Sequence, residues 1–383
     1  NPTIGLLFAA QALYWCCAMI GITLTALIGL QLAPGNALAT LPLAMLVIGN
    51  LLSVQPLALF MQRHGRRSGF LLGAACGIAG GVFSALAISL ESFALFCLAA
   101  LPIGACQASA VYYRFAAQDA VDEQHRGRAT AYVLGGGVCA ALIAPALAIW
   151  ARNALPVPFT GAYLLIAVLA GLGLLLAWQL PQSRASAAVR YDFALTRALL
   201  GRPIIRAALL TTAIGHGLMF LVMNATPLAM SLCGLSLEIS AEVIRWHMLG
   251  MFLPAFVAGP LVDRLGATRM ALLGCAVLAL SAAVALSGLN QWFFLFSSFL
   301  LGLGWNLMLV SGSTLLAAGH SADERGQAQG LMELGNGLVA ACASFASGAL
   351  ITGLGWSALN IAMLPLLAIA LWMLTLQSRP KPV

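Results

Sequence analysis

Long apolar stretches without any charge alternate along this chain with short polar breaks. The first charged residue is Arg63, so 62 residues precede any charge. Further uncharged stretches run between Arg67 and Glu91, Arg128 and Arg152, Arg152 and Arg184, Arg206 and Glu238, Arg269 and Asp323, and Glu333 and Arg379. Since about 20 apolar residues in a helix cross a bilayer, the pattern predicts an all-α, polytopic membrane protein.

The breaks between these stretches predict twelve transmembrane helices. The first is predicted to end at Pro34-Gly35-Asn36, because proline and glycine stop helices. The predicted spans are residues 4–31, 37–61, 69–90, 92–117, 129–151, 159–180, 205–230, 242–262, 269–288, 291–317, 327–353 and 356–377.

The basic residues alternate between the loops of the two sides and so predict an orientation. One side receives 16 of the 18 basic residues, and Arg152 and Arg245 remain for the other. The sixteen are Arg63, Arg66, Arg67, Arg114, Arg126, Arg128, Arg184, Arg190, Arg197, Arg202, Arg206, Arg264, Arg269, Arg325, Arg379 and Lys381. Positively charged loops stay in the cytoplasm, so both termini are expected there. The connection 182–204, with Ser183 and Ser186, predicts a cytoplasmic linker between six-helix bundles at 1–181 and 205–383.

Composition excludes several classes of protein. Of 383 residues, 62% are apolar and 8% are charged, whereas soluble domains carry about 25% charge. The net charge of +7 forms no basic patch, so no nucleic-acid partner is expected. Nine cysteines at scattered positions make no disulfide framework and no paired zinc-site pattern. Because the common hydrolase, phosphate-binding and metalloprotease motifs are missing, we expect neither an enzyme nor a bound cofactor.

The two halves of the chain resemble each other. Arg63-His64-Gly65-Arg66-Arg67 follows the second predicted helix, and Asp263-Arg264-Leu265-Gly266 follows the eighth. Arg126-Gly127-Arg128-Ala129 precedes the fifth, and Arg325-Gly326-Gln327-Ala328 precedes the eleventh. These landmarks repeat after 201 and 199 residues, from Gly65 to Gly266 and from Arg126 to Arg325. Six-helix repeats of this kind are typical of secondary transporters, whose substrate binds near the membrane midplane.

Residues 259–269 carry a more specific signal. They resemble the signature loop G-x-L-x-D-R-x-G-x-x-R of the major facilitator superfamily, with Gly259, Asp263, Arg264 and Gly266 in place. In the first half, Ala58 and Gln62 stand at the Gly and Asp positions. The resemblance implies two six-helix halves and a transport-cycle role for this loop, whose Asp and Arg lock helix ends in one state of alternating access. An ordinary solvated turn remains the alternative.

Methionine and histidine recur at helical spacing in the seventh and eighth predicted helices. Met219 and Met223 share one face with His216, and His247 and Met251 share a face of the next helix. Counted from the connecting turn, the two pairs lie at similar depth, facing each other across the hairpin. Thioethers and imidazole suit Cu(I), so the pattern predicts a copper site. Coincidental core packing by methionine is the alternative.

The same two motifs, M-x-x-x-M followed by H-x-x-x-M, resemble those of the CcoA-like copper importers, a bacterial group within the superfamily. The resemblance implies that Met219, Met223, His247 and Met251 bind copper as transported substrate. It also implies a multi-pass protein of the bacterial inner membrane that supplies copper for cytochrome oxidase assembly. A monomer is expected, although the sequence leaves the oligomeric state open. His216 is added on geometry alone.

Two questions stay open at the level of sequence. Related carriers of the group move organic solutes such as riboflavin, and an aromatic cavity would then matter, formed by Tyr14, Trp15, Tyr112, Tyr113 and Trp305. A receptor or assembly scaffold is a third class, which the lack of an extramembrane domain disfavours. Glu333 lies well inside an apolar run. It is either a proton site or the partner of a donor on a neighbouring helix.

Overall fold

The computed structural model describes residues 2–34, 38, 41–182 and 192–378. Over these residues the secondary structure is helical and no strand forms. Several sequence predictions fall outside the described residues: the break at Gly35-Asn36, the linker residues Ser183, Arg184, Ser186 and Arg190, and the C-terminal Arg379 and Lys381.

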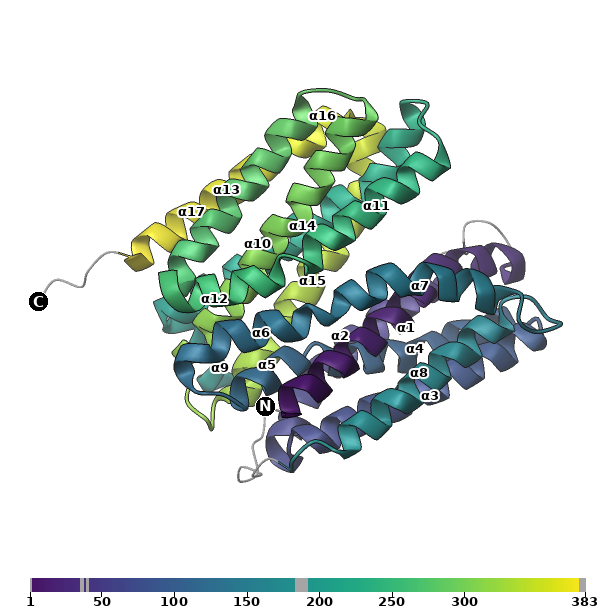
Figure 1. Ribbon diagram of the computed structural model, residues 1–383, viewed down its shortest axis with the longest axis horizontal. Coiled ribbons are helices and arrows are strands. Elements are labelled where there is room, and N and C mark those ends of the chain that lie inside the picture. Colours follow the sequence, from purple (N-terminus) through teal and green to yellow (C-terminus); the bar gives the residue numbers. More distant parts are fainter. Residues whose placement is uncertain (1, 35–37, 39–40, 183–191, 379–383) are drawn as a thin grey trace, which may run out of the picture. The chain divides into compact units, whose positions relative to one another are not determined.

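The helices follow one another along the chain (Figure 1). They are α1 (Pro2–Leu32), α2 (Leu41–His64), α3 (Arg66–Ser89), α4 (Phe93–Ala110), α5 (Tyr113–Asp119), η2 (Glu123–His125), α6 (Arg126–Leu134), α7 (Gly136–Arg152), α8 (Thr160–Trp178), α9 (Phe193–Gly201), α10 (Pro203–Leu232), α11 (Leu237–Phe252), α12 (Ala255–Leu265), α13 (Ala267–Leu286), α14 (Gln291–Gly319), α15 (Arg325–Gly353), α16 (Gly355–Ile361) and α17 (Met363–Ser378). Within the described residues, eleven segments are long and apolar enough to cross a membrane. This confirms the polytopic all-α fold. The predicted span 327–353 corresponds to α15, which is long enough but is not among the eleven.

Four predicted spans are interrupted where the sequence suggested single helices. The span 92–117 consists of α4 and α5, 129–151 of α6 and α7, 242–262 of α11 and α12, and 356–377 of α16 and α17. The break between α11 and α12 falls at Leu253-Pro254, because proline has no N–H for the helical ladder and clashes with the preceding turn.

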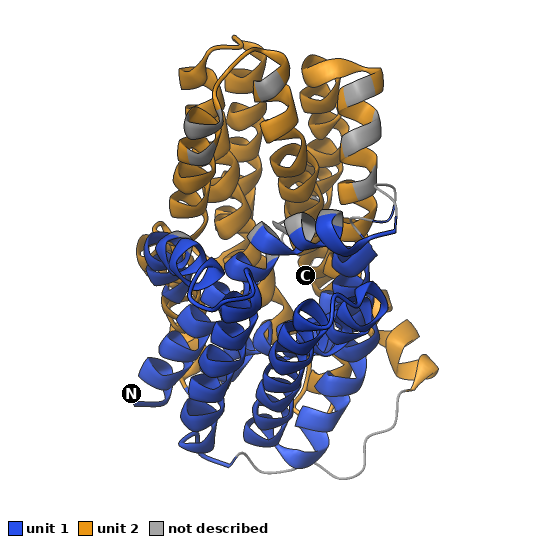
Figure 2. Cartoon of the chain, turned by 90° about the vertical axis from the view of Figure 1, so that its right-hand side faces the viewer, with its two compact units in different colours: residues 1–120, 136–191, 329–334 blue, residues 121–135, 192–328, 335–383 orange. Residues whose placement is uncertain are grey.

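The chain divides into two compact units that do not simply follow chain order (Figure 2). Unit 1 contains residues 1–120, 136–191 and 329–334. Unit 2 contains residues 121–135, 192–328 and 335–383. Each unit therefore includes a short segment from the other half of the sequence: α6 lies in unit 2, and residues 329–334 of α15 lie in unit 1.

The helices within each unit approach closely at glycines. In unit 1, a Cβ added to Gly49 of α2 would lie 2.2 Å from the carbonyl oxygen of Leu101 on α4. In unit 2, a Cβ added to Gly250 of α11 would lie 2.4 Å from the carbonyl oxygen of Phe299 on α14. Small residues at helix interfaces allow such close approach in membranes.

These glycine contacts also support the internal repeat. Gly49 and Gly250 are separated by 201 residues, and so are Gly73 of α3 and Gly274 of α13. Gly73 packs against Ser109 on α4, and Gly274 packs against Met308 on α14. Equivalent helices in the two halves thus use equivalent close contacts.

Candidate functional site

The signature loop joins α12 to α13 and anchors the start of α6 within unit 2. The Asp263 carboxylate accepts hydrogen bonds from the backbone N–H groups of Gly127 (2.9 Å) and Arg128 (3.1 Å). Helix N-termini leave unpaired N–H groups and carry partial positive charge, so a carboxylate is well suited to this position. Asp263 therefore caps a helix that is 135 residues or more away in sequence.

Two glycines of the loop are required by this geometry. A Cβ on Gly259 would lie 2.6 Å from the Cα of Arg128, so α12 and α6 touch through backbone at this point. Gly266 has φ +86°, a conformation that residues with a Cβ rarely adopt. Its first-half equivalent, Gly65, has φ +89°. Arg264 is exposed at the end of α12, and a role in the transport cycle stays a prediction for it.

The first-half copy of the loop makes a different set of contacts within unit 1. Arg66, at the start of α3, forms an ion pair with Asp119 of α5 (3.1 Å). The same guanidinium donates to the side-chain amide oxygen of Gln329 on α15 (2.6 Å). A buried arginine therefore links α3, α5 and α15, using the fixed fork of donors that arginine provides.

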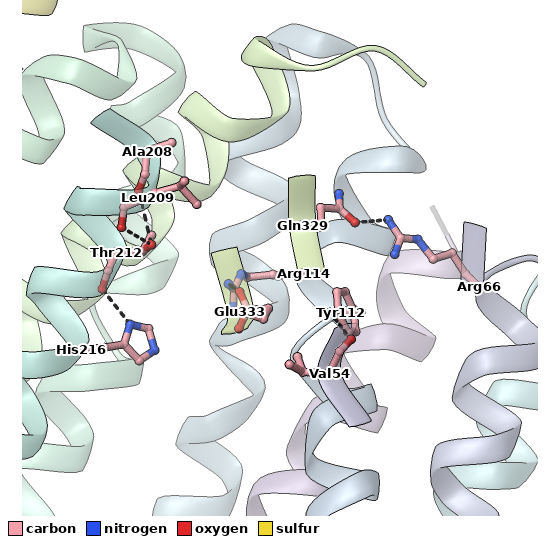
Figure 3. A network of polar contacts seen from close by, with 10 residues as sticks. All are labelled: Val54, Arg66, Tyr112, Arg114, Ala208, Leu209, Thr212, His216, Gln329 and Glu333. Atoms are coloured by element: carbon pink, nitrogen blue, oxygen red, sulfur yellow. Dashed lines mark hydrogen bonds and ion pairs between the residues drawn. The ribbon is translucent and has the colours of Figure 1, made fainter. Parts of the chain in front are cut away.

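Glu333 lies one turn after Gln329 on α15 and forms an ion pair with Arg114 of α5 (Figure 3). Both side chains are 5% exposed. The arginine also lies over the ring of Phe115, with 4.6 Å between the guanidinium carbon and the ring centroid. Of the two alternatives for Glu333, pairing with a donor on a neighbouring helix is the arrangement that the structure contains.

Arg114 is the residue whose importance the sequence reasoning missed. It appears there only as one of sixteen topology-setting charges, at the end of the predicted span 92–117. In the structure it is buried in α5, inside the candidate span Phe93–Asp119. The available signal was its position directly after Tyr112 and Tyr113, at the end of the uncharged run 92–113.

A second ion pair holds the start of α15 in unit 2. Arg202, between α9 and α10, binds both carboxylate oxygens of Glu324 at 2.6 and 2.7 Å. This hydrogen-bonded pairing lowers the pKa of Glu324 to about 2 and raises the pKa of Arg202. Next to it, the Gln327 amide exchanges hydrogen bonds with the backbone of Asp192. The pair therefore ties α15 to the segment that precedes α10.

The predicted copper ligands lie on two helices that both pack along α14 in unit 2 (Figure 1). The His247 imidazole on α11 is buried, and its Nδ1 lies 2.8 Å from the carbonyl oxygen of Ser298 on α14. Met251 is also buried, and its carbonyl accepts from the Asn306 amide of α14 (2.7 Å). Because a third helix packs along both, α10 and α11 make few contacts with each other. The prediction that α10 and α11 face each other directly across their hairpin is therefore wrong.

Contacts between α10 and α14 lie close in sequence to Met219 and Met223. On α10, Gly215 faces Met308 and His216 contacts Trp305, with 5.5 Å between ring centroids. Because the two helices are antiparallel, the next turns of α10 continue toward the Ser298 end. The match in depth between the methionine pair and His247 stays a prediction. Met219 is buried and Met223 is half-buried.

His216 is held by its own helix, because its Nδ1 lies 3.0 Å from the Thr212 carbonyl oxygen (Figure 3). Its ring meets Trp305 edge to face, and Phe252 contacts the same indole at 6.3 Å between centroids. Among the other aromatic candidates, Tyr14, Trp15, Tyr112 and Tyr113 belong to unit 1. No cluster of three or more His, Cys, Asp or Glu side chains suited to a metal occurs in the part of the chain that the structure describes.

Comparison with known proteins identifies what the chain is similar to. The family model described as Major Facilitator Superfamily matches residues 6–241 and 212–383. The riboflavin transporter RfnT of Brucella anthropi is 37% identical, over 99% of this chain and 96% of its own. Among solved structures, the human organic anion transporter MFSD10 has a TM-score of 0.78 at 15% identity, covering 97% of this chain and 98% of that one. The proton:xylose symporter XylE has 0.79 at 14%, covering 99% and 95%.

Proposed function

Because the chain belongs to the major facilitator superfamily, we propose that it carries a small organic solute across a bacterial inner membrane, with riboflavin or a related flavin as the first candidate. The observation that carries this proposal is the 37% identity to a riboflavin transporter over 99% of the chain. The proposal includes alternating access by the halves 1–181 and 205–383, joined by the linker 182–204. It also includes cytoplasmic termini and function as a single chain.

Aromatic groups of unit 2 support a flat, ring-shaped solute. Trp305 is almost fully buried and is flanked by His216 and Phe252. Its indole N–H is buried without a hydrogen-bond acceptor among the described residues. Aromatic faces together with a few convergent polar groups are typical of small-molecule sites. A heteroaromatic ring would supply both a stacking surface and an acceptor for this N–H.

Copper is the second candidate, and a specific observation favours it. His247 Nε2 is buried and finds no hydrogen-bond partner among the described residues, while Nδ1 is engaged by the α14 backbone. A histidine that binds metal through one ring nitrogen commonly has the other held by a carbonyl. Met251 and Met219 are both buried. These observations concern the ligand set alone, whereas the riboflavin relative matches nearly the whole chain.

Uptake by proteoliposomes separates the two candidates. Purified protein is reconstituted, and the uptake of radiolabelled riboflavin and of radiolabelled copper is measured in the same vesicles, each with the other compound as competitor. The flavin proposal expects riboflavin uptake at least tenfold above that of empty vesicles, undiminished by copper. Copper uptake without riboflavin uptake would overturn it in favour of the second candidate. No flux of either compound would overturn both.

Variants then test which residues bind the solute that is transported. For copper, Met219→Leu, Met223→Leu, His247→Leu and Met251→Leu should each abolish uptake. Met230→Leu and Met248→Leu are matched controls on the same two helices and should not change it. For riboflavin, Trp305→Ala should raise the KM severalfold, while Trp292→Ala, on the exposed start of α14, should leave it unchanged.

A further inference from the structure

Arg67, in the first turn of α3, lies over the indole ring of Trp178 at the end of α8. The guanidinium carbon is 5.0 Å from the ring centroid, and α3 and α8 pack against each other within unit 1 (Figure 1). Stacking uses the flat face of a guanidinium and leaves the N–H donors at its edge available. Arg67 forms no hydrogen bond or ion pair with any residue that the structure describes. Its donors can therefore bind a ligand without breaking an existing contact.

The surface around Arg67 carries positive charge that nothing nearby neutralises. Arg63, in the last turn of α2, is exposed and likewise forms no ion pair with a described residue. Asp119 of α5, an acidic residue that contacts the start of α3, is bound by Arg66 (3.1 Å). Two arginines on either side of the Gly65 turn thus offer their charge to a partner of opposite sign.

The turn between α2 and α3 is also tied to the residues that follow α8. The Gln182 amide donates to the His64 carbonyl (2.9 Å) and to the Ser68 hydroxyl (3.4 Å). The Ser68 hydroxyl donates to the same carbonyl (3.0 Å). Hydrogen bonds therefore hold together the two segments that carry Arg67 and Trp178. A site whose parts are fixed in advance loses little conformational freedom when a ligand binds.

The stacked pair lies at the boundary of the apolar part of unit 1. Three candidate membrane spans begin or end here: Leu41–His64, Arg66–Ser89 and Thr160–Trp178. Trp178 is 62% exposed, and Leu175 and Leu172, on the preceding turns of the same helix, are exposed as well. Exposed tryptophan at the end of a span is typical of the interface between membrane and water. The arginine donors therefore lie at the level of lipid headgroups, next to an apolar helix face.

Other arginines of the chain do not combine these features. In the second half of the repeat, Thr268 stands 201 residues after Arg67. Arg152, beyond the other end of α8, lies 4.9 Å over the ring of Phe159, but that ring is buried. A preference of basic loops for one side of the membrane requires charge alone. It does not account for an arginine stacked on an exposed indole.

We propose that this end of unit 1 binds the headgroup of an anionic phospholipid. Arg67 and Arg63 hold its phosphate, and its acyl chains lie along the exposed face of α8. A guanidinium binds two phosphate oxygens through parallel N–H donors, and basic pockets between helix ends are typical sites for lipid headgroups. Phosphatidylglycerol has a negative phosphate and no cation of its own, so it complements two arginines, whereas the choline of phosphatidylcholine neutralises its phosphate. The site goes beyond the proposed cargo and does not depend on it.

Lipid binding to the purified full-length chain tests the proposal. Native mass spectrometry measures the retention of dioleoyl-phosphatidylglycerol and of dioleoyl-phosphatidylcholine as each lipid is titrated into the detergent-solubilised protein. The wild type should prefer phosphatidylglycerol, and Arg67→Gln and Arg63→Gln should each weaken its binding about fivefold. Arg67→Lys keeps the charge but not the planar fork, so it should also lose most of the preference. Arg152→Gln, which removes an arginine stacked on a buried ring, is the matched control and should keep it.

Several results of this titration would overturn the proposal. One is equal affinity of the wild type for the two lipids, and another is an unchanged preference in Arg67→Gln. A loss of preference in Arg152→Gln as large as in Arg67→Gln would show that net charge alone attracts the lipid. Millimolar inorganic phosphate should not displace phosphatidylglycerol. Displacement would mean that the arginines bind a free anion and not a lipid.

Fluorescence quenching decides the question even if the Arg67 variants do not fold. Vesicles containing the wild type carry an equal small fraction of either phosphatidylglycerol or phosphatidylcholine with acyl chains brominated near the headgroup. Brominated phosphatidylglycerol should quench tryptophan emission more strongly, and this excess should disappear in Trp178→Phe. Trp292→Phe, at another exposed tryptophan, should retain the excess. Equal quenching by the two lipids, or an excess that persists in Trp178→Phe, would overturn the proposal.

Discussion

Two equivalent segments of the internal repeat are held in different ways. Helix α6 and the first turns of α15 occupy matching positions about 200 residues apart; α6 lies in unit 2, and residues 329–334 of α15 lie in unit 1. The start of α6 is held by the half-exposed Asp263 carboxylate through two backbone N–H groups. The α15 segment is held by the fully buried pair of Arg114 and Glu333.

The difference lies in what happens when each contact opens. Asp263 is half-exposed, so water replaces the lost backbone bonds at small cost. Glu333 is 5% exposed, so no water takes the place of Arg114. Repeated sequence therefore yields two contacts of unlike energetics, of which the buried ion pair is the more costly to open. Variants can widen or remove this contrast.

Arg114→Leu should have the largest effect, because it leaves Glu333 buried without its cation. Breaking a buried ion pair from one side costs about 3–5 kcal/mol. We expect a marked fall in the thermal midpoint of the detergent-solubilised protein, largely reversed in the double variant Arg114→Leu/Glu333→Leu. Arg245→Leu, which breaks an exposed pair, is the control and should change little. A single variant as stable as wild type would contradict the prediction.

Gly259→Leu should disturb the α6 contact next most strongly. Its side chain would begin 2.6 Å from the Cα of Arg128, so α12 and α6 must move apart. Overpacking of this kind costs about 1–3 kcal/mol. Gly171→Leu, at a helical glycine with nothing within 4 Å, serves as control. Equal thermal midpoints for the two variants would mean that the close approach of α12 and α6 is not tight in solution.

Asp263→Ala should have a smaller effect, since it removes hydrogen bonds without forcing the helices apart. Loss of a carboxylate at a helix N-terminus costs about 0.5–2 kcal/mol. Asp263→Asn keeps one acceptor oxygen and should fall between the alanine variant and wild type. Asp122→Ala, at an exposed carboxylate with no capping hydrogen bond, should leave the thermal midpoint unchanged. The prediction fails if the Asp122 and Asp263 variants cannot be distinguished.

The smallest effect should come from the ion pair at the start of α15, and it should depend on pH. The pKa of Glu324 is lowered from 4.5 to about 2 by its bonds to Arg202. Its contribution to stability is therefore complete above about pH 4.5 and is lost as the pH falls toward 2. Arg202 is 39% exposed, so we expect about 0.2–1 kcal/mol. The free energy of unfolding of Glu324→Gln, measured between pH 2 and pH 6, should lack this pH-dependent contribution. If the wild type and the variant lose stability in parallel as the pH falls, the assignment is contradicted.

Sequence reasoning was strongest where a pattern is local. Apolar run length predicted the membrane-spanning helices, and the repeat of Gly65 at Gly266 is confirmed by matching positive φ angles. It was weaker where a partner lies far along the chain. Asp263 could be read as a signature residue, but nothing local shows that it caps α6. Glu333 stood out in the sequence as an acid inside an apolar run and is buried in the structure, yet its partner Arg114 was counted only as a topology-setting charge.

The predicted copper ligands illustrate the same limit. Helical spacing placed His247 and Met251 on one face, and the structure puts that face against α14. Adjacency in sequence suggested that α10 and α11 face each other, but α14 packs along both. Connection by a short turn restricts the distance between helix ends. It does not decide which helix fills the space alongside them.

By itself, the sequence determined the membrane class, the repeat and the family. It also predicted twelve membrane spans, against eleven candidate spans within the described residues. Each of these depends on hydrophobic length or on short motifs. Only the tertiary structure decided that α6 belongs to unit 2 and residues 329–334 belong to unit 1. It also decided that Arg114 is buried against Glu333 and that His247 packs on α14. Those outcomes depend on which distant surfaces fit closely at glycines such as Gly259 and Gly250. Side-chain spacing along one helix carries no information about that fit.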